Sequence, residues 1–157
     1  MLALLFSVAL AAEPTITVTS DHTIVGEILV GISLEEAEAI IADPLKMASI
    51  DGTTNVTQDG TEGSCKRLNY VIPNPVASIS YRAKACPRDS GWIYTLISSD
   101  DLSEYHSAWS ATQEGTQTRI RYEIRTIPSI PVPQFIVNRQ SQSAVDGFLT
   151  RLSNYLD

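Results

Sequence analysis

The residues of this chain best suited to molecular recognition are aromatic side chains, not nucleophiles. Between residues 64 and 127 the sequence alternates apolar and polar positions, as strands with one buried face do. A tyrosine is costly in a dry core unless its hydroxyl finds a partner, so several on one face indicate a cavity that holds water or a ligand with polar atoms. The alternative is an ordinary core with the hydroxyls at its rim. The candidate ligand-binding residues on this face are Tyr70, Tyr81, Tyr94, Tyr105, Trp109 and Tyr122.

Two polar residues near the C-terminus extend this candidate site. Residues 134–142 are polar on nearly every side of a predicted helix, and such a segment cannot pack tightly on a core. Asn138 and Arg139 are therefore candidates to line a wet cavity mouth, with Arg139 positioned for an anionic head group. The alternative is a helix end that projects into solvent.

An enzyme needs a nucleophile, an acid–base pair or a metal cluster, and the sequence offers none with a recognisable spacing. It contains no G-x-S-x-G nucleophile elbow, no glycine-rich phosphate loop and no dinucleotide fingerprint. The two histidines, His22 and His106, are not spaced as metal ligands. We assign His106 to a surface pair with Glu123 and His22 to a turn. We therefore predict no catalytic residue, no metal ligand and no cofactor.

Two cysteines, Cys65 and Cys86, bear on the compartment in which the chain works. They flank a strong turn at residues 73–76. If Asn74 lies opposite Ala77 across that turn, Cys65 lies directly opposite Cys86 in the neighbouring strand. Opposed Cα atoms are about 4.5–5.5 Å apart, within reach of a disulfide. We predict a Cys65–Cys86 disulfide, which indicates an oxidising compartment.

The composition is that of one globular domain. The 157 residues are 43% hydrophobic and 18% charged, and the formal net charge of −7 argues against a nucleic-acid partner. Residues 1–12 are almost wholly apolar but too short to span a bilayer. Their Ala9-Leu10-Ala11 resembles a signal-peptide cleavage site, although the positively charged leader is missing. We predict a signal peptide or an apolar N-terminal segment at residues 1–12 and a single domain at residues 13–157.

Turn signals and periodicity predict the order of the elements. A long strand at 15–31, with a bulge near Gly26, precedes two short helices at 34–42 and 44–50. Ser33 and Glu36 form a capping box for the first helix. Six further strands follow at 53–58, 64–72, 77–86, 92–98, 103–112 and 117–127. Prolines then end the sheet, and one helix runs from Pro133 to the C-terminus. Its apolar residues at helical spacing are Val137, Val145, Phe148, Leu149, Leu152 and Leu156.

The last predicted hairpin provides a test of this interpretation. With Gln113 opposite Thr116, one face carries Tyr105, Trp109, Ile120, Tyr122 and Ile124. The other face then places Glu104 opposite Arg125 and His106 opposite Glu123. An apolar face and a face of paired charges are what a half-buried antiparallel sheet requires. In the middle hairpin the same reasoning puts Arg67 opposite Lys84, which is unfavourable.

This order of elements resembles the helix-grip superfamily that includes the START lipid-transfer domains, the birch-pollen allergen group and the polyketide cyclases. The resemblance covers residues 15–157. It rests on the element order, on the final hairpin at residues 109–123, and on the proline-led entry to the last helix at residues 130–139, which is most similar to START-type members. It implies an α+β fold, with a curved seven-stranded antiparallel sheet, two short helices after strand 1, and a long C-terminal helix across a cavity.

The resemblance implies binding, sequestration or transfer of a lipid or other apolar small molecule in that cavity. The apolar N-terminal segment and the predicted disulfide indicate that the protein is secreted or periplasmic. Neither local pattern is a catalytic signature, because both mark scaffold, and a fold does not decide function. Two alternatives remain: a cyclase- or hydrolase-like enzyme that acts on an apolar substrate in the same cavity, and an interaction module with a filled core. Transient contact with a membrane is left open, and the oligomeric state is not predicted.

Overall fold

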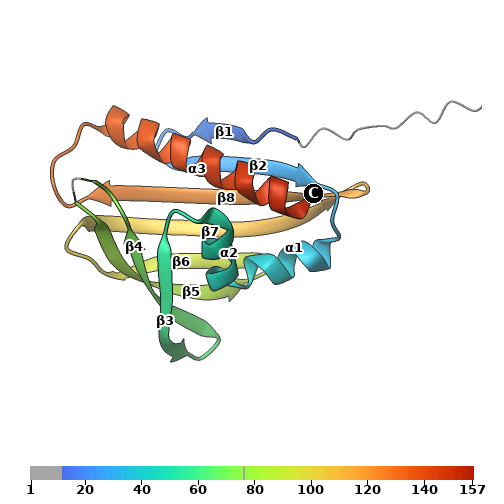
Figure 1. The fold of residues 1–157 in the computed structure, drawn as a ribbon, viewed down its shortest axis with the longest axis horizontal. Helices are drawn as coiled ribbons and strands as arrows, with labels where there is room; N and C mark the ends of the chain where they lie inside the picture. Colours follow the sequence, from blue (N-terminus) through green and yellow to red (C-terminus); the bar gives the residue numbers. More distant parts are fainter. Residues whose placement is uncertain (1–11, 76) are drawn as a thin grey trace, which may run out of the picture.

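The computed structural model describes residues 12–75 and 77–157. Their core element is one antiparallel sheet in the order β1-β2-β8-β7-β6-β5-β4-β3. Figure 1 shows the three helices on one side of this sheet, with α3 lying along β2. The sheet is strongly curved, so β3 and β4 run across the direction of β7 and β8. The bounds are β1 Thr15–Val18, β2 Ile24–Val30, α1 Leu34–Ile41, α2 Pro44–Asp51, β3 Asn55–Glu62, β4 Cys65–Ile72, β5 Ile79–Arg88, β6 Gly91–Ser98, β7 Leu102–Glu114, β8 Gln117–Pro128 and α3 Gln134–Leu156.

The sheet has eight strands, not the predicted seven, because the first predicted strand is a hairpin. β1 and β2 pair antiparallel, and Thr15 lies opposite Glu27. The turn between them is built by short polar side chains: Thr19 donates to the Asp21 carboxylate, and the Thr23 amide donates to the Thr19 hydroxyl at 3.1 Å. His22 adopts the left-handed conformation, with φ of 66°. Side-chain hydrogen bonds can support such a turn without glycine or proline.

The helices begin and end where local signals place them. The Ser33–Glu36 capping box is present at α1, as predicted. Asp43 caps α2 by accepting from the Lys46 amide at 3.0 Å, and Gly52 ends it in the left-handed conformation. α3 packs closely on β2 because Gly26 has no side chain there. A Cβ at Gly26 would lie 2.5 Å from the Leu149 side chain and 2.6 Å from that of Val145.

The middle hairpin has the predicted register. Tyr70 lies opposite Tyr81 and Arg67 opposite Lys84. The predicted disulfide between Cys65 and Cys86 is present, with Cα atoms 4.2 Å apart. β3, longer than predicted, relieves the unfavourable pair of cations: Asp59 contacts Arg67 at 3.7 Å, and Glu62 contacts Lys84 at 3.9 Å.

The final hairpin has the predicted faces but not the predicted register. Gln113 lies opposite Thr118, so the ladder is shifted by two residues. The loop consists of Gly115 and Thr116, with Gly115 in the left-handed conformation (φ 62°), and both strands extend to meet it. Because side chains alternate with a period of two, a shift of two leaves every residue on its predicted face. His106 therefore pairs with Arg125 rather than Glu123, and the Glu104–Arg125 ion pair survives at 3.5 Å.

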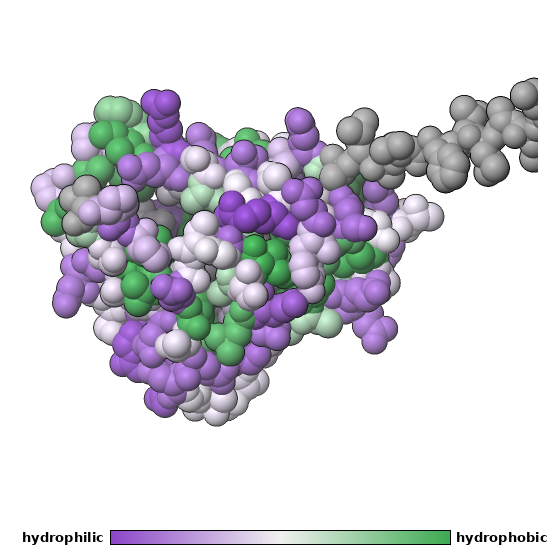
Figure 2. Space-filling model, viewed as in Figure 1, coloured by the Kyte–Doolittle hydropathy of each residue, from purple (hydrophilic) through white to green (hydrophobic). Residues whose placement is uncertain are grey.

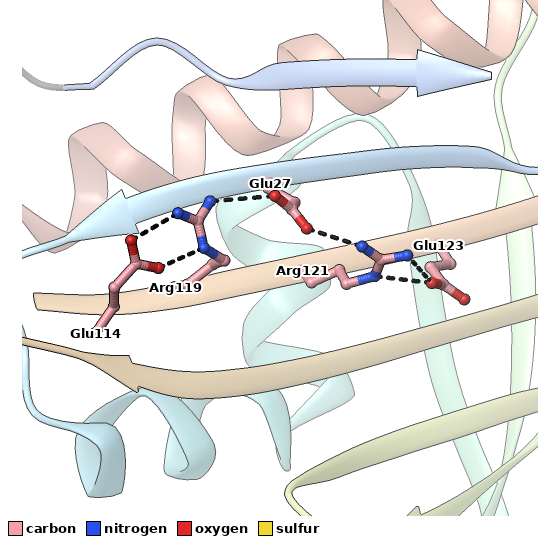
Figure 3. Close-up of polar contacts among 5 residues, drawn as sticks. All are labelled: Glu27, Glu114, Arg119, Arg121 and Glu123. Carbon is pink, nitrogen blue, oxygen red and sulfur yellow. Dashed lines mark hydrogen bonds and ion pairs between the residues drawn. The ribbon is translucent and has the colours of Figure 1, made fainter. Parts of the chain in front are cut away.

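The outer face of β2, β8 and β7 carries a chain of alternating charges (Figure 3). Glu27 accepts from Arg119 at 3.1 Å and from Arg121 at 2.8 Å. Glu114 holds Arg119 through both carboxylate oxygens, and Glu123 accepts two bonds from Arg121. The charged side chains of this face are therefore paired with one another, and the apolar side chains of the sheet lie on the opposite, helix-bearing face.

Candidate functional site

Three tyrosine rings form a continuous row on the inner face of the sheet. The Tyr70 and Tyr81 rings are stacked at 4.8 Å with an angle of 3° between their planes. The Tyr81 ring then contacts that of Tyr105, 4.6 Å away, although β5 and β7 are separated by β6. Tyr70 is half-buried, whereas Tyr81 and Tyr105 are buried. The row thus leads from the partly exposed end of β4 into the interior.

A second aromatic group lies between the sheet and α3. Trp109 and Tyr122 stack at 4.1 Å with 15° between their planes. Phe148 of α3 meets both rings edge-on, at 5.3 Å from Trp109 and 6.2 Å from Tyr122. Phe148 is therefore the direct contact between the terminal helix and the aromatic face. Sequence reasoning placed it on the apolar stripe of the helix but did not assign it to the site.

A series of hydroxyl groups joins the two aromatic groups. The Tyr105 and Ser107 hydroxyls are hydrogen-bonded at 2.8 Å in a buried setting. The Tyr81 hydroxyl interacts with that of Tyr105, and the Tyr122 hydroxyl with that of Ser107. Ser107 is only 1% exposed and sits between Tyr105 and Trp109 on the inner side of β7. Sequence reasoning missed Ser107, although strand alternation alone would have placed it on this face.

Burial raises the pKa of each tyrosine on this face. Loss of hydration is the largest cause for Tyr70, Tyr81, Tyr94, Tyr105 and Tyr122. Tyr94 lies opposite Ser107 in the ladder, and the nearby Asp43 carboxylate further raises its pKa. All five phenols are therefore neutral at physiological pH, able both to donate and to accept hydrogen bonds.

The structure does not bring Asn138 and Arg139 to the aromatic face. The Asn138 amide is 3.1 Å from Nδ1 of His22, in the turn between β1 and β2, and its oxygen accepts from Gln134 at 2.8 Å. Arg139 is exposed and lines a surface hollow of about 380 Å³ on the outside of α3, together with Phe135, Ile136, Gln140 and Ser143. The first turns of α3 thus use their polar residues to hold the β1–β2 turn and to face solvent.

A second hollow, of about 630 Å³, lies over charged side chains of β7 and β8. Glu104, His106, Glu123 and Arg125 line it, with Asp21 of the β1–β2 turn. His106 is exposed there, on the outer side of β7. Within residues 12–75 and 77–157, no three His, Cys, Asp or Glu side chains are grouped as metal ligands. No helix in the same residues is long and apolar enough to cross a membrane.

An ion pair between the buried Asp51 carboxylate and the partly exposed Arg151 fastens α2 to α3 beside the aromatic face. Asp51, 8% exposed, accepts from Arg151 at 2.5 Å and from the Thr53 hydroxyl at 2.5 Å. The Asp51 charge also contributes to the raised pKa of Tyr122. The Asp51 carboxylate therefore anchors the terminal helix to the end of α2. Figure 2 shows apolar side chains between the polar ones on this helix-bearing side of the molecule.

No protein-family model matches this sequence, and no characterised protein matches it in sequence. Solved structures do match the fold. A START superfamily protein from Mycobacterium smegmatis superposes with a TM-score of 0.75 at 13% identity, over 85% of this chain and 96% of that one. TTHA0849 from Thermus thermophilus superposes with a TM-score of 0.76 at 16% identity, over 85% of this chain and 96% of that one. The chain has the helix-grip fold. The Zhui aromatase/cyclase from Streptomyces sp. R1128 is a third helix-grip match, with a TM-score of 0.64 at 10% identity over 85% and 90%.

The predicted resemblance to helix-grip proteins is therefore confirmed at the level of fold. The long C-terminal helix and the large antiparallel sheet are present, with one strand more than predicted. The six predicted aromatic residues lie on the inner face of the helix-grip sheet, and five of them belong to the two ring groups described above. The signal peptide or apolar N-terminal segment was predicted at residues 1–12. Residues 1–11 of it lie outside the described part of the chain.

Proposed function

We propose that this helix-grip domain binds an apolar small molecule between α3 and the aromatic inner face of its sheet, and that it acts as a carrier or sequestering protein. The observation that carries the proposal is the buried series of hydroxyls among stacked rings. Aromatic walls with a few well-placed polar groups are typical of sites for small apolar ligands. The helix-grip neighbours support this choice by fold alone.

The arrangement of α3 supports the same proposal. Its close backbone contacts are with β1, β2 and α2 and, to a lesser extent, β8. The rings of Trp109 on β7 and Tyr122 on β8 are contacted from the helix by the Phe148 side chain. A guest that displaces or slides between those rings would bury apolar area worth about 25 cal/mol per Å² before ordering costs.

We further propose that the single domain spans residues 13–157 and works in an oxidising compartment, secreted or periplasmic. The Cys65–Cys86 disulfide supports this location. Guest exchange would require α3 or the β4–β5 loop to move, and a transient membrane contact would supply an apolar guest.

A second candidate is an enzyme of the cyclase or hydrolase type in the same interior. The Tyr105–Ser107 hydrogen bond favours it, because a neutral phenol held by a second hydroxyl can polarise a carbonyl group. The third candidate is an interaction module. The edge-on contact of Phe148 with the stacked Trp109 and Tyr122 rings favours that reading, because the rings themselves occupy space between helix and sheet.

Native mass spectrometry of the protein purified from its own host, followed by solvent extraction, tests the proposal. We expect a reproducible co-purifying lipid, terpenoid or other apolar compound. Turnover of an extracted compound by the purified protein would favour the enzyme instead. A protein that arrives empty and takes up no apolar probe would refute the binding function and favour the filled-core module.

A further inference from the structure

The polar groups inside the aromatic face are hydroxyls, and their charge state restricts the guest. Among the described strand residues, Lys66 is a cation on the inner face, two positions from Leu68 on β4. The Lys66 ammonium donates to the Ala42 carbonyl at 2.8 Å and sits 5.1 Å from the centre of the Trp92 ring, so it is committed to the end of α1. Arg151 is paired with Asp51, and Arg139 is on the outer side of α3. No cation among the described residues contacts the hydroxyl series.

The series also has a hydrogen-bond donor to spare. Tyr81, Tyr105, Ser107 and Tyr122 supply four O–H groups. Even if all three contacts along the series are hydrogen bonds, they use three of those donors. The remaining O–H group of the series can donate to an acceptor oxygen on a guest.

We infer that the interior selects an uncharged, flat apolar molecule that carries an accepting oxygen, such as an alcohol, phenol or ketone, and discriminates against a carboxylate. This inference rests on the proposed function. The parallel planes of the Tyr70–Tyr81 and Trp109–Tyr122 pairs suit a flat guest. A carboxylate would lose its hydration without meeting a counter-charge.

The surroundings of the phenols support this choice. Nearby charges recorded at Tyr94 and Tyr122 come from Asp43 and Asp51, and both raise the tyrosine pKa values. A site that opposes ionisation of its own phenols also opposes an anionic guest. The head-group role that the sequence suggested for Arg139 does not apply to this interior, because that side chain is exposed on the other side of the helix.

Binding of matched probes tests the inference. Pyrenebutanol and pyrenebutyrate differ only in the charged end, and energy transfer from the protein's tryptophans reports their binding. At about pH 8, where a carboxyl group is ionised, we expect the alcohol and the methyl ester of the acid to bind at least about tenfold more tightly than the carboxylate. Retinol and retinoate are a second pair of probes that differ in charge. They are thinner than pyrene and would fit a narrower binding site.

Variants locate the effect within the series. Tyr105→Phe keeps the ring and removes the hydroxyl. It should weaken binding of the alcohol probe by about three- to tenfold. Tyr155→Phe is the matched control, because Tyr155 is exposed beneath Lys46 at the end of α3. It should leave binding unchanged.

The possible outcomes separate the inference from the proposed function. Equal binding of alcohol and carboxylate would overturn the selection for uncharged guests and leave the carrier function standing. Tighter binding of the carboxylate, abolished in Lys66→Met, would overturn it by assigning the ammonium as the head-group partner. Failure of all the probes, neutral and charged, would refute the binding function itself and the inference with it.

Discussion

The disulfide gives the sharpest prediction for stability. The double variant Cys65→Ala/Cys86→Ala removes a cross-link between residues 21 positions apart. In the chain-entropy account, a loop of this length contributes about 3 kcal/mol to the free energy of unfolding. A domain of this size loses about 2–4 °C of melting temperature per kcal/mol, so the variant should melt about 6–12 °C below the oxidised protein.

Thermal unfolding followed by circular dichroism, with and without a reductant, measures the effect. On reduction, the melting temperature of the wild-type protein should fall by the same amount as in the double variant. The melting temperature of the double variant should not change when the reductant is added. Cys65 and Cys86 lie on the outer face of β4 and β5, away from the tyrosines, so probe binding by the folded variant should be unchanged. A native mass without the deficit of two hydrogens would show that the bridge does not form. An intact bridge whose loss shifts melting by less than about 2 °C would refute the entropic reasoning.

Three further predictions concern the helix–sheet contact and the aromatic face. Gly26→Ala places a methyl group against α3 and should destabilise the domain by about 1–3 kcal/mol in chemical denaturation, whereas Gly31→Ala, at a position with open space, should cost much less; equal costs would contradict the close approach. The five inner-face tyrosines have raised pKa values, so each keeps its proton in the folded state while the unfolded chain releases it near about pH 10. Their stabilising contribution is full below that pH and is lost as the pH rises above it, so their phenolate absorbance should appear only together with loss of circular dichroism; ionisation in a protein that is still folded would disprove their burial. Trp109→Ala should weaken uptake of a fluorescent sterol or retinol by about tenfold or more, and Glu104→Ala, on the outer face, should not; equally small effects would show that the guest does not bind on the aromatic face.

The parts of the fold that follow from local signals were predictable. The Ser33–Glu36 box started α1, and the prolines near residue 130 ended the sheet before α3. The register of β4 and β5 was right because the turn at residues 73–76 fixed it, and the disulfide followed from that register. The β7–β8 register was wrong by two residues because Gly115 sits at the first loop position instead of the second. Each residue was still assigned to the correct face of the sheet, because side chains alternate with a period of two.

The parts that failed depend on partners distant in sequence. The β1–β2 turn contains no glycine or proline, so its hydrogen bonds were invisible in the sequence pattern. Asn138 meets His22, a residue 116 positions away, and this contact turns it from the predicted cavity mouth. The aromatic residues themselves were predictable from alternation. Their joining through Ser107 and their contact with Phe148 required the curvature of the sheet, which no local pattern encodes.

The pairing of β2 with β8 has a consequence for how the chain is made. Ile24 lies beside Ile124, so the apolar inner strand β2 cannot complete its ladder until residues 117–128 have been synthesised. At a synthesis rate of about 5–20 residues per second, β8 is complete about 5–20 s after β2, and β2 lacks its β8 partner during that time. Such non-local pairing makes for slow folding and leaves an aggregation-prone edge exposed. A nascent chain truncated before β8 would therefore present an open, apolar strand, the kind of segment that chaperones hold until the last hairpin arrives.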